Sequence, residues 1–433
     1  MKKILFIIPY VPYPLNSGGN QAFFNMVDYL RSYMKVSLLL CAFSSRDKNN
    51  IASLEEVWPD VSFYVFEKRN NFDAIKIKLK HPLYYKLLEK IKNSATRKMR
   101  RQVIQEGDFT RKMSVLLKSL YQDFEYGYVD FVGEVSRQGF DFIQVEFFEL
   151  VALGYILPKD VDTIFVHHEL RYVRNENELS LFEEKRQEDQ LHYCVAKDFE
   201  RTALKAFKYV IALTEVDRKL LVDFLERDDR IFASPAVVHF NVSQEMQFQP
   251  ATEHRFTFVG YGNHYPNVDA VFWLCREIAP YLRQHHFPFR LQVVGEGYAT
   301  FEEELKALCP EVELLGYVKD LKPVLQGSIA LVPIRIGSGM RMKILDMISL
   351  GIPFITTSKG VEGIQLQSGT DCLIVDTAED IAQAMMQLAA NSEMQQKMVQ
   401  AAHAKLDSLY RPQEMLERRW QIYQQIMQES GKE

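Results

Sequence analysis

Residues 328–357 read SIALVPIRIGSGMRMKILDMISLGIPFITT and have the pattern of a strand, a tight loop, a helix and a second strand. An apolar run of strand length at 329–333 precedes a Gly-Ser-Gly loop at 337–339, which lets the backbone approach a ligand. Helical periodicity follows over 340–350, and Gly351 stands where a helix C-terminal glycine belongs. The pattern predicts a crossover helix whose N-terminus faces the carboxyl edge of a sheet.

Two cations, Arg341 and Lys343, lie in the first turn of this helix, and Asp346 follows Lys343 by one turn on the same face. Cations near a helix N-terminus are unfavourable by roughly 0.3–1 kcal/mol each. A bound anion would reverse that sign. We therefore predict a phosphate-bearing ligand at this position, with Asp346 reaching a hydroxyl beyond it. The alternative is an ordinary crossover helix with two solvated basic residues.

Length and composition indicate an ordinary soluble protein of two or three domains. The chain has 433 residues, 47% apolar and 25% charged, and its net charge of −5 argues against a nucleic-acid partner. No signal peptide or membrane span is expected, because prolines interrupt the apolar start. Five cysteines without metal-ligand spacing indicate reduced thiols in the cytoplasm: Cys41, Cys194, Cys275, Cys309 and Cys372.

The first 240 residues alternate strands and helices around polar strand ends. Gly18 and Gly19 stand in a loop after the first strand, but no G-x-G-x-x-G pattern follows, which argues against a nicotinamide dinucleotide. A strand at 142–145 ends in Glu146, and one at 163–166 ends in His167 and His168. Such ends face the ligand crevice of an open α/β sheet. Only one of two adjacent histidines can reach it. A helix is predicted over 171–207, and 231–238 is assigned to the domain connection.

An interruption at about 66–138 is predicted to be a helical insertion. Its 68–101 segment carries a local charge excess of +10 interleaved with apolar residues. Such a segment can lie on an anionic membrane, and a solvated helical insertion or an acidic acceptor are the alternatives.

The second half alternates strands and helices more regularly, which predicts a second parallel sheet covered on both faces. Gly260–Asn263 and two later glycine turns end its strands. The final helix, 411–433, has an apolar stripe and is expected to pack back on the first domain. The predicted domains are 1–240, 241–410 and this helix.

These segments together resemble the GT-B glycosyltransferases, specifically the large retaining family 4. The resemblance rests on V-G followed by P-N-V-D-A (Val259 to Ala270), on V-V-G-E-G and L-L-G-Y-V-K-D, and on the G-S-G-M-R-M-K-I-L-D stretch. It implies two Rossmann-like domains facing a cleft. It also implies transfer of a sugar from a nucleoside-diphosphate sugar to a glycan or lipid-linked acceptor with retention, without a metal or other cofactor.

Site residues are carried over from the family by position. The resemblance implies that Arg341 and Lys343 neutralise the diphosphate, and that Asp346 stands where a glutamate usually binds the ribose. The implied donor site comprises Gly260, Gly262, Asn263, Val318, Ser338, Gly339, Met340, Arg341, Lys343 and Asp346. The implied catalytic residues are His168, Lys343 and Arg341, with His167 as the less favoured histidine. The implied acceptor side comprises Gly18, Gly19 and Glu146.

Two departures from the family pattern stand out. Ser338 replaces the first of two acids spaced eight apart, with Asp346 in the second position, and the usual Arg-Lys pair after the first strand of the second domain is missing. We expect Arg341 and Lys343 to take over the role of that pair. The departures leave two alternatives: a catalytically silent nucleotide-sugar or glycan-binding subunit, and an epimerase on the same fold.

Overall fold

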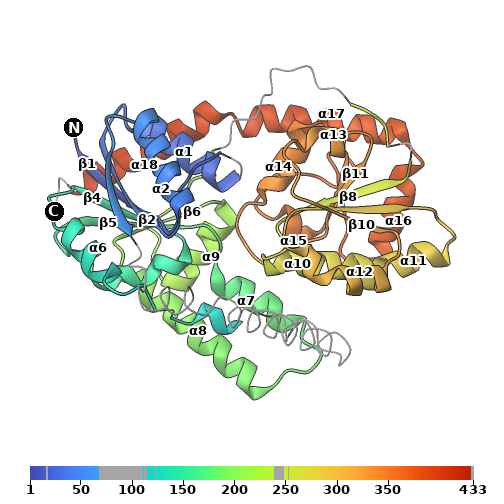
Figure 1. Cartoon of the computed structure of the whole chain (residues 1–433), viewed down its shortest axis with the longest axis horizontal. Coiled ribbons are helices and arrows are strands. Elements are labelled where there is room, and N and C mark those ends of the chain that lie inside the picture. Colours follow the sequence, from blue (N-terminus) through green and yellow to red (C-terminus); the bar gives the residue numbers. More distant parts are fainter. Residues whose placement is uncertain are drawn as a thin grey trace, which may run out of the picture.

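The structure, a computed structural model, describes residues 1–15, 18–67, 111, 114, 116–121, 123–237, 248–251 and 253–430. Two parallel β-sheets form two domains that lie side by side (Figure 1). The predicted fold class is therefore confirmed. The basic 68–101 segment lies outside the described residues.

The N-terminal domain has a seven-stranded sheet in the order β3-β2-β1-β4-β5-β6-β7. Its strands are β1 (Lys3–Ile7), β2 (Lys35–Ala42), β3 (Ser62–Glu67), β4 (Phe142–Glu146), β5 (Asp162–His167), β6 (Tyr209–Ala212) and β7 (Ile231–Ala233). Its helices are α1 (Gly18–Leu30), α2 (Ser45–Val57), η1 (Leu116–Ser119), α6 (Tyr128–Ser136), η2 (Phe148–Tyr155), α7 (Arg171–Ser180), α8 (Gln187–Lys205) and α9 (Glu215–Leu225). The central strands are apolar on both faces because helices cover both sides.

The C-terminal domain has a six-stranded sheet in the order β10-β9-β8-β11-β12-β13. Its strands are β8 (Arg255–Val259), β9 (Arg290–Val294), β10 (Val312–Gly316), β11 (Ile329–Val332), β12 (Phe354–Thr356) and β13 (Leu373–Ile374). Its helices are α10 (Tyr265–Trp273), η3 (Leu274–Ile278), α11 (Ala279–Gln284), η4 (Tyr298–Phe301), α12 (Glu302–Leu308), α13 (Lys322–Leu325), α14 (Met342–Ser349), α15 (Ser358–Val361), α16 (Ala378–Ala389) and α17 (Ser392–Leu409).

Both sheets change winding direction beside their first strand. In the N-terminal sheet β1 lies between β2 and β4, and in the C-terminal sheet β8 lies between β9 and β11. Ligands of open α/β sheets bind outside the carboxyl ends of the strands at such switch points. The two switch points therefore position the candidate site.

The last helix, α18 (Pro412–Ser430), returns from the C-terminal domain to the N-terminal one (Figure 1). Arg419 of α18 is buried and donates from Nε to the hydroxyl of Ser234 at 2.7 Å. The hydroxyl of Tyr423, also buried, donates to the side chain of Gln144 on β4. Helix α18 is thus part of the N-terminal domain's core.

Two sequence expectations need correction. The helix predicted over 171–207 is broken into α7 and α8, because the chain turns at 181–186 to bury Phe182 in a small apolar cluster with Tyr193. Helix α8 then begins at Gln187. The side chain of Asp189 caps its N-terminus by accepting from the backbone N–H of Arg186 at 3.1 Å. Part of the predicted connection at 231–238 is strand β7, because its backbone pairs with β6.

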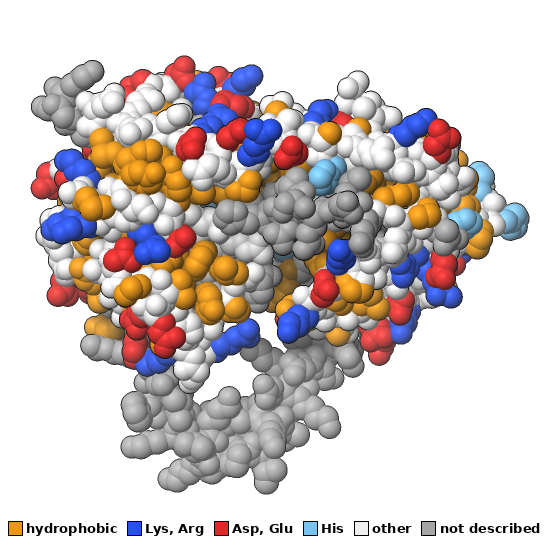
Figure 2. All heavy atoms as spheres, turned by 90° about the horizontal axis from the view of Figure 1, so that it is seen from above, with side chains coloured by type: hydrophobic (Ala, Val, Ile, Leu, Met, Phe, Trp, Pro, Cys, Tyr) orange, Lys and Arg blue, Asp and Glu red, His pale blue; other side chains and the backbone are white. Residues whose placement is uncertain are grey.

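Charged side chains of both signs are interspersed on the face shown in Figure 2, with apolar groups gathered between them. Among the described helices, none combines the length and apolar character that crossing a membrane requires.

Candidate functional site

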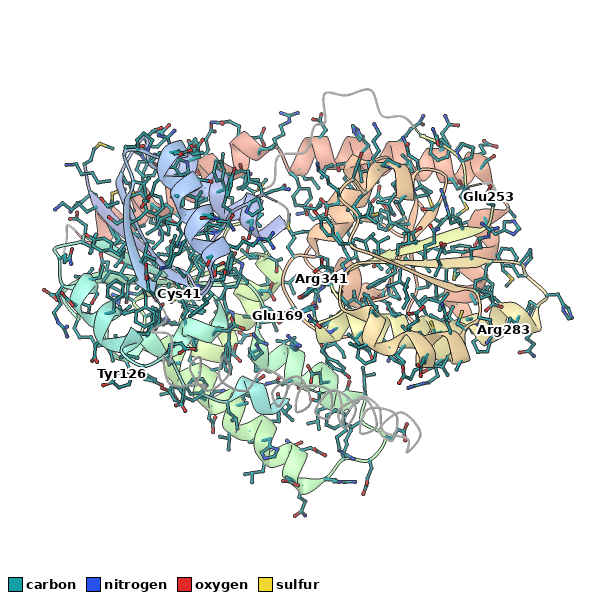
Figure 3. All side chains as sticks on the ribbon, viewed as in Figure 1. Cys41, Tyr126, Glu169, Glu253, Arg283 and Arg341 are labelled. Carbon is teal, nitrogen blue, oxygen red and sulfur yellow. The ribbon has the colours of Figure 1, made fainter. Side chains whose placement is uncertain are left out.

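A cavity of ≈ 750 Å³ lies between the two domains, at the carboxyl ends of β4, β5, β8 and β11. Its N-terminal wall is formed by residues after β4 and β5, and its C-terminal wall by the turn after β8 and the loop that enters α14. Glu169 from the first wall and Arg341 from the second lie close together where the domains meet (Figure 3). Of the predicted residues, His168, Asn263, Ser338, Met340, Arg341 and Lys343 line this cavity.

Lys343 is a half-buried amine held in place by two side chains. Its Nζ donates to Oδ1 of Asn267 at 2.8 Å and lies 4.6 Å from the ring centre of Phe258. Asn267 is itself oriented, because its Nδ2 donates to the backbone carbonyl of Tyr261 at 3.0 Å. Burial, together with the neighbouring Arg341, lowers the pKa of Lys343 to about 7. An anion in the cavity would stabilise the charged form that burial disfavours.

Asp346 lies one turn beyond Lys343 on α14 and does not line the cavity. Burial raises the pKa of its carboxyl to about 6, although Lys343 opposes the shift. At neutral pH the carboxylate is therefore ionised but poorly compensated, and a hydroxyl donor would stabilise it. The structure places Lys343 and Asp346 on one helix face, as their spacing predicts.

Arg341 has a guanidinium that is only partly paired. Its Nη1 donates to the carbonyl oxygens of Ser338 and Gly339, whereas its Nη2 has no hydrogen-bond partner in the part of the chain that the structure describes. Burial lowers its pKa. The unpaired nitrogen suits an anionic partner.

The loop at 337–339 places Ser338 on the cavity wall and also packs against the N-terminal domain. The backbone N–H of Leu170 donates to the hydroxyl of Ser338 at 2.6 Å. Gly339 has a φ of +80°, and a Cβ there would lie 2.2 Å from the carbonyl oxygen of His168. Glycine permits close approach by any backbone, so the sequence could not say that the neighbour is another part of the same chain.

The two adjacent histidines have separate environments. His168 lies at the cavity, with its Nε2 2.8 Å from Oε2 of Glu146 and its ring stacked on Phe147 at 3.9 Å. His167 points the other way and is buried, with its Nε2 2.7 Å from Oε1 of Glu200. Glu146, which the resemblance implies for the acceptor side, is buried and pairs with His168.

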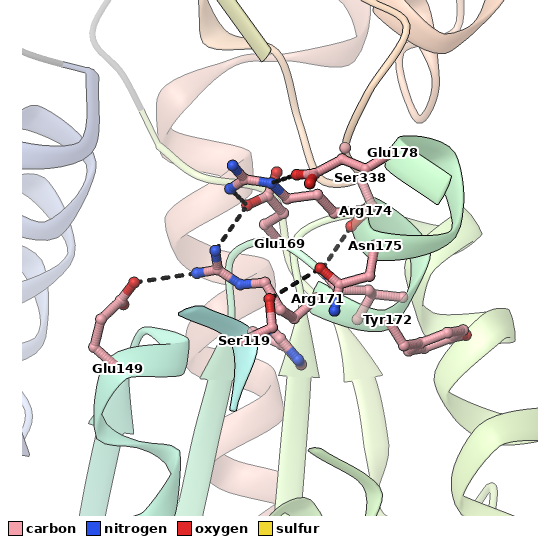
Figure 4. Close-up of polar contacts among 12 residues, drawn as sticks. Ser119, Glu149, Glu169, Arg171, Tyr172, Arg174, Asn175, Glu178 and Ser338 are labelled. Carbon is pink, nitrogen blue, oxygen red and sulfur yellow. Dashed lines mark hydrogen bonds and ion pairs between the residues drawn. The ribbon is translucent and has the colours of Figure 1, made fainter. Parts of the chain in front are cut away.

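A network of charged residues in the N-terminal wall was missed from the sequence (Figure 4). Arg174 pairs with Glu169 at 2.9 Å and with Glu178 at 3.1 Å, and Arg171 pairs with Glu149 at 3.1 Å. Burial alone would raise the pKa of Glu169, but the two arginines overcome it and hold it at about 2. The sequence signal for this network is the spacing of three between Arg171 and Arg174 in the first turn of α7, which places both on one helix face.

The remaining predicted residues do not line the cavity. Gly260 packs so closely on Asn267 that a Cβ would come within 2.7 Å of its side chain. Gly18 begins α1 and faces Met342 in the same way at 3.1 Å. Also outside the lining are Gly19, Glu146, Gly262, Val318, Gly339 and Asp346. Throughout the described residues, no group of three or more His, Cys, Asp or Glu side chains is arranged to hold a metal ion.

Two parallel-sheet domains with a cavity between their strand ends are the arrangement of the GT-B fold. Residues 253–391, in the C-terminal domain, match the family described as glycosyl transferases group 1. Its C-terminal domain is thus similar to the glycosyl transferases of group 1.

Solved structures with the same fold cover nearly the whole chain. Sucrose-phosphate synthase from Thermosynechococcus elongatus is 13% identical with a TM-score of 0.67, covering 99% of both chains. TarM from S. aureus, in complex with fondaparinux, alpha-GlcNAc-glycerol and UDP, is 12% identical with a TM-score of 0.63 over 98% of this chain and 100% of that one. Anabaena HepE in complex with UDP-glucose is 12% identical with a TM-score of 0.60, over 99% and 100%. No curated protein matches the chain.

Proposed function

We propose that the protein transfers a sugar from a nucleoside-diphosphate sugar to an acceptor hydroxyl, with retention and without a metal ion. The observation that carries this proposal is Lys343, a half-buried amine at the start of α14 that lines the cavity and is held by Asn267. Desolvation outweighs the attraction of Asp346 and disfavours the charged form of Lys343, so its placement at the cavity favours an anionic ligand.

In the proposed reaction, the bond between the sugar C1 and the diphosphate oxygen breaks and a bond from C1 to the acceptor oxygen forms on the same face. The acceptor proton passes to the leaving phosphate. Lys343, Arg341 and the N–H groups at the start of α14 stabilise the charge that develops on the diphosphate, and no metal is required for that task. Asp346 accepts from the ribose hydroxyls, and His168 contacts the donor sugar.

The acceptor is proposed to be a glycan or lipid-linked glycan that enters from the N-terminal side of the cavity. Peripheral contact with an anionic membrane through 68–101 is part of this proposal. Vesicle co-sedimentation over a salt series tests it: binding lost only at high salt supports the contact, and absence of binding at low salt contradicts it.

Release of nucleoside diphosphate from a panel of UDP-, GDP- and dTDP-sugars tests the transferase proposal. TarM and HepE were solved with UDP, which makes UDP-sugars the first to try. Lys343→Ala should lower turnover by about 10²–10³-fold, because charge stabilisation at a leaving group is worth several kcal/mol. Lys306→Ala is the matched control, since Lys306 is an exposed lysine paired with Glu302 on α12. Equal turnover in both variants would refute the proposed site.

A catalytically silent binding subunit is the second candidate. Ser338 replaces an acid of the family pattern, and its hydroxyl already accepts from Leu170. Nucleotide binding without product release in the whole donor panel would favour this candidate.

A further inference from the structure

A continuous chain of buried hydrogen bonds joins the C-terminal helix to His168. The hydroxyl of Tyr423 on α18 donates to Oε1 of Gln144 at 2.5 Å. Nε2 of Gln144 donates to Oε1 of Glu146 at 2.7 Å, and Oε2 of Glu146 lies 2.8 Å from Nε2 of His168. Tyr423, Gln144 and Glu146 are each at most 2% exposed, so water cannot replace these partners.

The direction of each hydrogen bond in this chain is fixed by its first donor. Burial raises the pKa of Tyr423 to about 12, so its hydroxyl stays protonated and donates to the Gln144 carbonyl. The Gln144 amide nitrogen must then face Glu146. A carboxylate only accepts hydrogen bonds, so its second oxygen accepts one from Nε2–H of His168. The neutral imidazole is thereby held as the Nε2–H tautomer, which makes Nδ1 its hydrogen-bond acceptor.

Phe147 fixes the plane of the same imidazole. Its ring stacks on His168 with an interplanar angle of 4°, and Tyr10 packs edge-on against its ring at 5.1 Å. Phe147 does this from a φ of +73° and a ψ of 141°, a conformation that L residues rarely adopt. Backbone strain of this kind costs of order 1–3 kcal/mol and persists where the surroundings impose it, often at functional sites.

We propose that Glu146 is a positioning residue that holds His168 in one tautomer and orientation toward the donor sugar, and that Gln144 and Tyr423 fix Glu146 from behind. The proposal rests on the proposed sugar transfer for its effect on rate. It assigns α18 a part in the site, although α18 contributes no residue to the cavity wall.

Glu146→Gln is the decisive variant because it keeps shape and removes one acceptor. An amide between the N–H groups of Gln144 and His168 can accept from only one of them. The expected result is a shift of His168 to the Nδ1–H tautomer, visible in ¹⁵N chemical shifts of selectively labelled histidine in the full chain. His168→Gln assigns the signal among the ten histidines. We expect kcat to fall about 10²-fold, because misplacing a reacting group by about 1 Å costs that much, with donor KM little changed.

Tyr423→Phe removes only the first donor and should lower kcat by several-fold. Its matched control is Tyr209→Phe, which removes a buried phenol hydroxyl from β6 outside the chain of hydrogen bonds. Glu146→Asp keeps the carboxylate and should restore the Nε2–H tautomer. An unchanged tautomer and an unchanged kcat in Glu146→Gln would overturn the proposal, as would equal losses in Tyr423→Phe and Tyr209→Phe.

The tautomer is measured without donor or acceptor. If the wild-type protein turned over no nucleotide sugar, the proposed function would fail while the histidine signal would still decide whether Glu146 sets the tautomer. The two failures are therefore distinguishable.

Discussion

Nucleotide binding to this protein should be coupled to the uptake of a proton, and the amine of Lys343 should be the group that binds it. Burial lowers the pKa of Lys343 to about 7 in the ligand-free protein. Its side chain is therefore mostly the neutral amine at pH 8, whereas a bound diphosphate would restore the charged ammonium by pairing with it. Because the complex binds more protons than the free protein, the affinity for the nucleotide falls as pH rises above 7.

The magnitude can be worked from this pKa. At pH 8 about one tenth of the free protein carries the proton, so binding should take up about 0.9 proton per nucleotide. Between pH 8 and 9 the affinity should fall nearly tenfold, or about 1.4 kcal/mol. UDP does not contribute, because its terminal phosphate has a pKa of about 6. Asp346, with a pKa of about 6, is already ionised over this range.

Isothermal titration calorimetry of UDP at pH 8, in buffers of different ionisation enthalpy, measures the uptake directly. The observed enthalpy should depend on the buffer in the wild type and in Lys306→Met, the exposed-lysine control. Lys343→Met should abolish the dependence. A wild-type enthalpy independent of buffer, or an uptake that survives in Lys343→Met, would refute the reasoning.

Three further outcomes are expected. Asp346→Ala should weaken UDP binding at least about tenfold, since a hydrogen bond to a charged group is worth about 1.5–3 kcal/mol. Binding of 2′-deoxy-UDP should be nearly unaffected in the same calorimeter. Equal losses of affinity for both ligands would show that Asp346 does not bind the ribose. Gly339→Ala should separate the domains, because its Cβ would lie 2.2 Å from the carbonyl of His168, and an unchanged radius of gyration in solution scattering would contradict this. Turnover should be unaffected by EDTA, and loss of activity that Mg²⁺ restores would contradict the metal-independent mechanism.

The alternation of apolar runs with helical patterns was enough to predict the two parallel sheets. Strands buried on both faces, such as β1 and β11, leave an unmistakable apolar run in the sequence. The break between α7 and α8 was not predictable from periodicity, because it depends on where Phe182 finds a tertiary contact.

In the site, too, relations fixed by local geometry could be predicted, whereas those that depend on tertiary contacts could not. Lys343 and Asp346 could be placed on one face because helix geometry alone fixes that relation. The orientation of the 337–339 loop could not be predicted, since it depends on a hydroxyl–amide contact with Leu170 in the other domain. Likewise the resemblance places Glu146 on the acceptor side, whereas its burial and its hydrogen bond to His168 depend on tertiary contacts that the sequence does not reveal.

Helix α18 has a consequence for how the chain acquires its structure. Domains generally fold one after another as they emerge from the ribosome. Here the first domain lacks Arg419 and Tyr423, both buried in it, until the second domain has been synthesised. The core of the N-terminal domain therefore stays incompletely packed while the second domain is translated. A fragment truncated before residue 412 should behave as a poorly folded species rather than as an independent module.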